Sequence, residues 1–324
     1  MRRAMRLLLV GFLLLAAFAY LNNSALFAPA GIGRPTLLAH RGLAQTFSHV
    51  DVKADTCTAS RIDPPEHPYL ENTIASMDAA FRAGADIVEF DVHPTTDGAF
   101  VVFHDWTVDC RTDGKGVTRS HTLAALQALD IGYGYSADGG RTFPFRGKGV
   151  GLMPTLDEVL SAFPGKRFLI HVKSNDAGEG EQLAAKLAAL PPSRLADLIV
   201  YGGNAPVAAF AVKLPAVRTM SKASLKSCLL RYFVLGWTGY VPATCSNSML
   251  LVPINVAPWL WGWPVRFLER MRRAHTDVYL LGPWDGDEFS RGLDSADEFR
   301  NLPAGYSGGI WTNRIDRIAP MVKP

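Results

Sequence analysis

Short apolar runs alternate with helical patterns along most of this chain. The runs are rich in branched residues and end at glycine, proline or polar residues, which is typical of buried strands. They lie at residues 36–41, 87–92, 167–173, 198–202, 216–220, 249–254, 277–282 and 308–313. Between most of them, apolar residues recur with the period of a helix, at residues 72–83, 156–163, 179–190, 205–213 and 264–274.

Strands that alternate with helices predict an α/β fold. The eight runs favour a (β/α)8 TIM barrel over an open doubly wound sheet. No Gly-x-Gly-x-x-Gly turn follows the first run, so the sequence does not indicate a dinucleotide-binding sheet. We expect residues 34–324 to form one barrel domain.

Two long segments interrupt the alternation after the early strands. Residues 45–70 and 99–154 are rich in glycine, proline and polar residues. Long connections without regular structure are usually functional, and in a barrel they lie at the carboxyl-end face. We therefore expect two insertions that cap the mouth of the barrel.

The N-terminus is a targeting segment. Three arginines lie within the first six residues, Leu7–Leu21 carries no charge, and the next charged residue is Arg34. The small residues Ala28-Pro29-Ala30 are typical of signal cleavage, whereas an uncleaved helix could span a membrane if Asn22–Asn23 lies at the interface. Residues 1–33 are thus a signal peptide or an N-terminal membrane anchor, and either would export the rest of the chain to the periplasm or the cell exterior.

Export affects how the four cysteines are interpreted, because disulfides form in oxidising compartments. The cysteines are even in number and lack the close spacing of a zinc site. Three connectivities are available. We expect Cys57–Cys110 and Cys228–Cys245, because each bridge would hold one long, turn-rich segment.

The charge of the chain excludes one class of partner. The formal net charge is +3, and the three leader arginines account for it. The remainder is near neutral and has no basic field, so we expect no nucleic-acid ligand.

The second apolar run places two carboxylates on one face. In "GADIVEFDVHPTTDG", Glu89 and Asp91 alternate with Val88, Phe90 and Val92, so the carboxylates point into the barrel and the apolar face packs against helices. Buried carboxylates need a cation. A basic side chain and a hard divalent ion both satisfy this requirement.

Other apolar runs deliver basic side chains to the same rim. "LLAHRG" presents His40 and Arg41, "VVFHD" presents His104, and "FLIHVKS" presents His171 and Lys173. Two histidines can divide the roles of acid and base, and an arginine with a lysine can neutralise a phosphate. Together with the carboxylates, these residues predict a phosphoryl substrate.

These motifs resemble the glycerophosphodiester phosphodiesterase family, which has a (β/α)8 fold. The resemblance is carried by "AHRG", "ENTIASMDAAFRAGADIVEFDVHPTTDGAFVVFHD" and "PTLDEVL" and covers most of residues 36–175, with a weaker echo at "GGIWTNRID". It implies a phosphoric diester hydrolase that uses one divalent metal ion, Ca²⁺ or Mg²⁺.

The resemblance also implies a role for each matching residue. It assigns the general base and acid to His40 and His104, metal ligation to Glu89 and Asp91, and phosphate binding to Arg41 and Lys173. Glu71 and Asn72 would support the site near the first-strand loop, with Glu71 as a further candidate ligand.

The chain departs from the family pattern in two places. The family usually has Glu-x-Lys where this chain has His171-Val172-Lys173. An imidazole is softer than a carboxylate and uncharged, so His171 as a ligand would favour Mn²⁺ or Zn²⁺ over Ca²⁺ or Mg²⁺. Later, "VYLLGPWDGDEF" replaces a Trp-Thr-Val-Asn-like strand, although Tyr279 and Trp284 could still line a pocket.

The sequence therefore predicts an exported, metal-dependent enzyme that hydrolyses glycerophosphodiesters or lysophospholipid-like diesters to an alcohol and a phosphomonoester. The nucleophile is water or a neighbouring substrate hydroxyl. The alternative is a noncatalytic protein that binds phosphodiesters or phospholipids on the same fold, because His171 replaces a metal ligand. A metal-dependent glycosidase would leave Arg41 and Lys173 without a role.

A late segment predicts a membrane contact, with core packing as the alternative. "APWLWGWPVRFLERMRR" combines aromatic and basic side chains, namely Trp259, Trp261, Trp263, Arg266, Arg270, Arg272 and Arg273. A membrane contact would favour a lysophospholipid over a small soluble diester.

Overall fold

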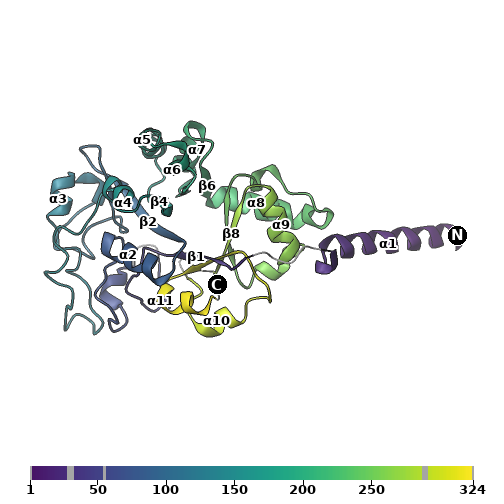
Figure 1. Ribbon diagram of the computed structural model, residues 1–324, viewed down its shortest axis with the longest axis horizontal. Coiled ribbons are helices and arrows are strands. Elements are labelled where there is room, and N and C mark those ends of the chain that lie inside the picture. Colours follow the sequence, from purple (N-terminus) through teal and green to yellow (C-terminus); the bar gives the residue numbers. More distant parts are fainter. Residues whose placement is uncertain (1, 28–32, 54–55, 287–290, 323–324) are drawn as a thin grey trace.

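The computed structural model describes residues 2–27, 33–53, 56–286 and 291–322. Within these residues, nine strands form one sheet that curls into a barrel with helices around it (Figure 1). Eight of the strands form the parallel order β6-β5-β4-β2-β1-β9-β8-β7. Their bounds are β1 Thr36–Ala39, β2 Ile87–Pro94, β4 Arg167–Val172, β5 Leu198–Gly202, β6 Arg218–Ser221, β7 Met249–Pro253, β8 Asp277–Leu281 and β9 Gly309–Thr312.

The eight predicted strands are confirmed, with ends that shift by at most two residues. The barrel nearly closes between β6 and β7, where Thr219 and Ser248 form an isolated parallel bridge. The Ser248 hydroxyl donates to the Thr219 carbonyl over 2.7 Å. This closure brings the carboxyl ends of all eight parallel strands to one rim, as the (β/α)8 prediction requires.

The five predicted helices are confirmed, as α2 Ile74–Ala83, α4 Leu156–Ala162, α5 Ala177–Leu187, α7 Asn204–Lys213 and α9 Val265–Arg273. The described part of the barrel domain has further helices, α3 Leu123–Gln127, α6 Pro192–Leu195, α8 Lys222–Leu235, α10 Ala296–Arg300 and α11 Ile315–Ile318. The prediction of an irregular segment around Cys228 was wrong, because α8 runs through it. Its start is marked by a capping box in which the side chains of Ser221 and Ser224 each accept from the other's backbone N–H.

The two predicted insertions pack together as one cap beside the barrel. A core of eleven buried residues, separate from that of the barrel, joins both segments and includes Ile62, Val101 and Tyr135. The second insertion was expected to be irregular throughout, but it begins with β3 Phe100–Val102, which pairs antiparallel with β2. That pairing carries the chain back toward the barrel rim.

Both predicted disulfides are confirmed. Cys57–Cys110 joins the two insertions within the cap, across 53 residues of sequence. Cys228–Cys245 joins α8 to a short 3-10 turn across 17 residues. Each disulfide therefore links segments that lie outside the barrel strands and are not restrained by strand pairing.

We expect the Cys57→Ser/Cys110→Ser variant to lose about 4 kcal/mol of unfolding free energy, because the bridge closes a long loop in the unfolded chain. The expected loss for Cys228→Ser/Cys245→Ser is about 3 kcal/mol, because its loop is shorter. Denaturant titration measures both losses, and limited proteolysis locates them. Cleavage of the first variant should concentrate in the cap, and a cap as resistant to protease as in the wild type would contradict this expectation.

The N-terminal helix α1 Arg2–Asn23 projects from the barrel on the side of α8 and α9, and the cap with α3 lies at the opposite end of the molecule (Figure 1). None of its residues is buried. By its length and composition, α1 is able to cross a membrane. A signal sequence near the N-terminus would have the same features. The expected cleavage pattern Ala28-Pro29-Ala30 lies outside the described residues.

Candidate active site

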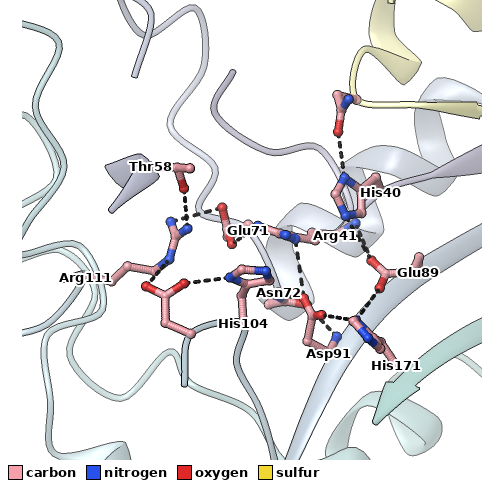
Figure 2. Close-up of polar contacts among 12 residues, drawn as sticks. His40, Arg41, Thr58, Glu71, Asn72, Glu89, Asp91, His104, Arg111 and His171 are labelled. Carbon is pink, nitrogen blue, oxygen red and sulfur yellow. Dashed lines mark hydrogen bonds and ion pairs between the residues drawn. The ribbon is translucent and has the colours of Figure 1, made fainter. Parts of the chain in front are cut away.

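The carboxyl ends of β1, β2 and β4 bring the predicted polar residues together at the rim (Figure 2). Arg41 follows β1 and Lys173 follows β4, while Glu89 and Asp91 lie on β2. The backbone N–H of Phe103, just after β3, donates to the Asp91 carbonyl over 3.0 Å. This hydrogen bond places the next residue, His104, at the rim near Asp91.

The turn that follows β1 has a glycine at residue 42, because the start of α2 leaves no room there for a side chain. A Cβ atom on Gly42 would lie 2.6 Å from the Ser76 Oγ atom and 2.8 Å from the Ser76 carbonyl carbon. Arg41 itself has a φ of 57°, a conformation uncommon for residues other than glycine. Its carbonyl accepts from the Asn72 N–H over 3.1 Å and from the Ser76 hydroxyl over 3.3 Å, so α2 holds this turn in place.

Glu89, Asp91 and His171 form a compact group of metal-type donors. One ligand atom from each lies within 4.8 Å of the others. Glu89 accepts from the Tyr201 hydroxyl over 2.7 Å and from the Arg41 N–H over 3.2 Å. The Nδ1 atom of His171 lies 2.8 Å from an Asp91 carboxylate oxygen, so all three side chains are held in position.

The two carboxylates of this group differ in their electrostatic surroundings. Burial alone would raise the pKa of Asp91, but the ammonium of Lys173, 3.4 Å away, and the guanidinium of Arg41 hold it well below its usual range. Burial and the neighbouring Asp91 raise the pKa of Glu89 to about 8. The raised pKa of Glu89 indicates that the neighbouring basic groups do not fully compensate two ionised carboxylates. A divalent cation would supply the missing positive charge, so these donors fit such an ion.

Asn72 holds Asp91 from the other side. Its amide nitrogen donates to the Asp91 carboxylate over 2.9 Å, and its amide oxygen accepts from the Asp91 N–H over 3.1 Å. Like Arg41, Asn72 has a positive φ, of 59°. The predicted supporting role of Asn72 thus corresponds to a two-point contact with Asp91, through its carboxylate and its backbone N–H.

His40 is fixed in one tautomer by a residue from the far end of the chain. Its Nδ1 atom lies 2.7 Å from Oδ1 of Asn313, and the Asn313 amide nitrogen donates to Asp294 over 2.8 Å. Because Asp294 accepts from the amide, Asn313 presents its oxygen to His40, which must carry its proton on Nδ1. The Nε2 atom is then free and lies 3.8 Å from Glu89. Burial and the nearby Arg41 hold the pKa of His40 well below its usual value, so the ring is neutral.

His104 has the same arrangement with a different partner. Its Nδ1 atom lies 2.6 Å from a carboxylate oxygen of Asp105, whose second oxygen lies 3.0 Å from the guanidinium of Arg111. Burial, together with the charges of Arg41 and Lys173, lowers the pKa of His104 to about 4. The site therefore holds two neutral histidines, one paired with an amide and one with a carboxylate.

Glu71 connects the cap to the site. Its two oxygens accept from Arg41 over 2.9 Å and from Arg111 over 3.1 Å. Arg111 comes from the cap and also donates to Tyr135 and Thr58, each over 2.7 Å. Glu71 faces two guanidinium groups and lies outside the metal-type group, so we assign it to this connection and not to metal ligation.

Two cavities meet at His40 and Arg41. One, of about 450 Å³, is also lined by His104, His171 and Lys173 and has an apolar wall that includes Leu251 and Trp311. The other, of about 420 Å³, extends toward the segment from Arg291 to Arg317 and is more polar. A phosphodiester centred on Arg41 would therefore have room for a substituent on each side.

Sequence reasoning missed the partners that orient the site residues. Asp105 and Asn313 lie inside the quoted motifs "VVFHD" and "GGIWTNRID" and could have been identified there. Asp294, Arg111 and Tyr201 carry no such local signal, because only the closed barrel and the docked cap bring them to the histidines and to Glu89.

Residues 40–190 match the Glycerophosphoryl diester phosphodiesterase family. These residues make up a little under half of the chain, so the match shows a similarity to this family. Its sequence is 40% identical over 124 residues to a glycerophosphodiester phosphodiesterase of Bacillus subtilis (strain 168), which covers 36% of this chain and 41% of that protein. The chain thus spans about two fifths of the length of this curated relative.

Solved structures of the glycerophosphoryl diester phosphodiesterase family share the fold. One is the phosphodiesterase domain of an uncharacterized protein from Mycobacterium tuberculosis, with a TM-score of 0.64 and 17% identity over 89% of this chain and 99% of that one. Another is an Oleispira antarctica phosphodiesterase in complex with the product sn-glycerol-3-phosphate, with a TM-score of 0.52 and 18% identity over 87% of this chain and 94% of that one. At these identities, the similarity extends the barrel assignment beyond residue 190 to most of the chain.

Proposed function

We propose that this protein is a metal-dependent phosphodiesterase that hydrolyses glycerophosphodiesters to an alcohol and a phosphomonoester. The observation that carries the proposal is the pair of neutral histidines, each with Nδ1 held by an acceptor, at a cavity that also contains the carboxylate group, Arg41 and Lys173. The family match and the product complex of the Oleispira antarctica relative support the same substrate class.

The proposed metal ligands are Glu89, Asp91 and His171. When bound, a divalent ion would polarise the phosphodiester and stabilise negative charge on its oxygens. Burial lowers the pKa of His171 to about 4, so its imidazole is neutral and able to act as a ligand. We propose Mn²⁺ or Zn²⁺ ahead of Ca²⁺ or Mg²⁺, because an imidazole replaces a harder, charged ligand.

The two histidines differ in the form that their partners stabilise. His40 donates to a neutral amide oxygen, which leaves its neutral form undisturbed and suits it to take a proton from the nucleophile through Nε2. His104 donates to the carboxylate of Asp105, which stabilises a protonated ring. An anionic phosphate bound beside His104 would stabilise that form further, so we assign protonation of the leaving oxygen to His104 and phosphate binding to Arg41 and Lys173.

The proposed substrates are water-soluble diesters such as glycerophosphocholine and glycerophosphoethanolamine. His104 and Glu71 contact residues that reach the cap, and the cap lies at the end of the molecule opposite α1 (Figure 1). The polar lining of the second cavity also suits a hydrated head group better than an acyl chain.

We propose that the barrel is exported and lies outside the cytoplasm. The three arginines at the start of α1 favour a cytoplasmic N-terminus. The two disulfides are consistent with an oxidising compartment. Residues 1–33 would then serve as the leader or membrane anchor that directs export, and residues 34–324 would form the exported barrel domain.

Chelation of divalent metal is expected to abolish hydrolysis of glycerophosphocholine, and re-addition of Mn²⁺ or Zn²⁺ is expected to restore it. The measurement is product release by the full chain in detergent after dialysis against chelator, with each metal ion returned separately. The His171→Glu variant is the matched control, because a hard, charged ligand should move the preference toward Ca²⁺ or Mg²⁺.

Two results would contradict this proposal in different ways. Hydrolysis that persists after complete chelation would show that the reaction does not require a divalent metal ion. If no ion supports hydrolysis but the diester still binds, the chain is a noncatalytic phosphodiester-binding protein.

A further inference from the structure

The last turn of α1 is bound to the barrel by a set of polar contacts. The side-chain amides of Asn22 and Asn23 donate to the Trp237 carbonyl over 3.1 and 2.9 Å. The guanidinium of Arg270 on α9 donates to the Asn22 carbonyl and to the Asn23 side-chain oxygen, each over 2.9 Å. The ring of Phe18 packs edge-on against Trp237. These contacts join α1 to the barrel at one defined place.

The contacts of Arg270 make α1 a structural part of the barrel. This guanidinium is buried, and its other partners are the Tyr232 hydroxyl and the Gly236 carbonyl, each at 2.9 Å. Two of its acceptors come from α1, and removal of α1 would take both away from a buried charge. The expectation that Arg270 faces a membrane was wrong, because it points inward to hold the end of α1.

Exposed apolar side chains surround this attachment point. They come from α8, from the turn after it and from the segment before α9, namely Leu230, Phe233, Val234, Tyr240, Trp259 and Trp261. We call these six residues the collar. The indole N–H of Trp261 donates to the Phe233 carbonyl over 2.8 Å, so the two segments form one surface. Trp259 is 73% exposed, whereas Trp263 packs against Phe267 and Tyr306 and is not part of the collar.

The sequence that carries the collar has charges of one sign. From residue 198 to residue 268 it contains no aspartate or glutamate, and the first acidic residue after it, Glu269, pairs with Arg266 and Arg273. The same stretch contains six lysines and arginines, of which Lys226 and Arg231 are exposed on α8 beside the collar. Exposed aromatic side chains beside basic ones are complementary to a bilayer that contains anionic lipid.

The geometry points to α1 as a retained single membrane span, with the collar resting on the surface of an anionic bilayer outside the cytoplasm. The uncharged part of α1, Leu7–Asn23, corresponds to about 26 Å at the helical rise, at the lower end of the range for a helix that spans a hydrocarbon core. The span ends where the collar begins, so the two features form one continuous surface for lipid. This inference does not depend on the proposed hydrolysis.

The first test is the mass of the full chain purified from membranes. Retention of α1 requires an intact mass that includes residues 1–33, whereas a mature chain that begins near residue 30 would overturn the inference. The Asn22→Ala/Asn23→Ala variant tests the attachment itself. We expect faster hydrogen exchange in residues 236–240 than in the wild type, with unchanged hydrolysis, because neither asparagine contacts the active site.

The second test locates the collar. The full chain is reconstituted into vesicles of phosphatidylcholine and phosphatidylglycerol whose acyl chains carry bromine, which quenches nearby tryptophan fluorescence. We expect the Trp259→Phe/Trp261→Phe variant to lose much of the quenching seen in the wild type. The matched control is Trp106→Phe, since Trp106 is 46% exposed in the cap at the other end of the molecule, and it should leave the quenching unchanged.

Two outcomes would overturn the collar assignment. Quenching that is equal in the wild type and in the Trp259→Phe/Trp261→Phe variant would place the collar away from lipid. A stable dimer in detergent that Phe233→Ser dissociates would show that a second copy of the chain covers this surface.

Discussion

Replacement of His40 by alanine is expected to lower kcat by about 10²–10⁴-fold, the range typical of a lost general acid or base. In the part of the chain that the structure describes, the nearest partner of the His40 Nε2 atom is Glu89 at 3.8 Å, and His40 lines both cavities. Its ring packs 4.7 Å from that of Trp311, and a water molecule could fill part of the space left by the imidazole. We therefore expect the barrel to stay folded while turnover is lost.

The measurement is hydrolysis of glycerophosphocholine by the metal-loaded enzyme, with circular dichroism to confirm the fold. His121→Ala is the matched control, because His121 lies in the cap and its ring nitrogens face the carbonyls of Val117 and Lys115. Asn313→Ala should lose less activity than His40→Ala, since it removes only the group that fixes the tautomer. A His40→Ala enzyme with wild-type kcat would exclude His40 from catalysis.

The Arg111→Met variant is expected to lose about 3–5 kcal/mol of unfolding free energy, the usual cost of removing one partner from a buried ionic network. Arg111 is buried and contacts the carboxylates of Glu71 and Asp105. Both carboxylates would keep one partner, Arg41 and His104 respectively, but would lose their connection to the cap. The same change should lower activity, because Asp105 would no longer be held beside His104.

Denaturant unfolding measures the stability, and assays at saturating metal measure the activity. The matched control is Lys115→Met, since Lys115 is exposed in the cap and, among the described residues, its ammonium forms one ion pair, with Asp109 at 3.7 Å. Its loss should remain within about 0.5 kcal/mol, as for most surface changes. If Arg111→Met is as stable as the control, the network is not what holds the cap to the barrel.

The elements that were predicted correctly are those with a local signal. The strands were found from short apolar runs, and the carboxyl-end rim follows once those strands are parallel. His40, Asp91 and His171 could be placed at that rim because each lies on or directly after a run. The apolar run in "VVFHD" was recognised, but it was not counted among the strands, because three residues next to a long polar segment carry too little periodicity to predict an antiparallel strand.

The order of the polar and apolar residues was thus enough to determine the barrel and the residues at its mouth. The cysteine pairing was also predicted correctly, although the segment around Cys228 is helical. Only the tertiary structure decided which tautomer His40 adopts, because Asn313 reaches His40 across 273 positions of sequence. It also decided that Glu71 pairs with two arginines and that Arg270 faces α1. These outcomes depend on contacts between segments that are distant in the sequence. The periodicity of a strand or helix predicts the face on which a side chain lies, but it does not predict which side chain from another segment will contact it.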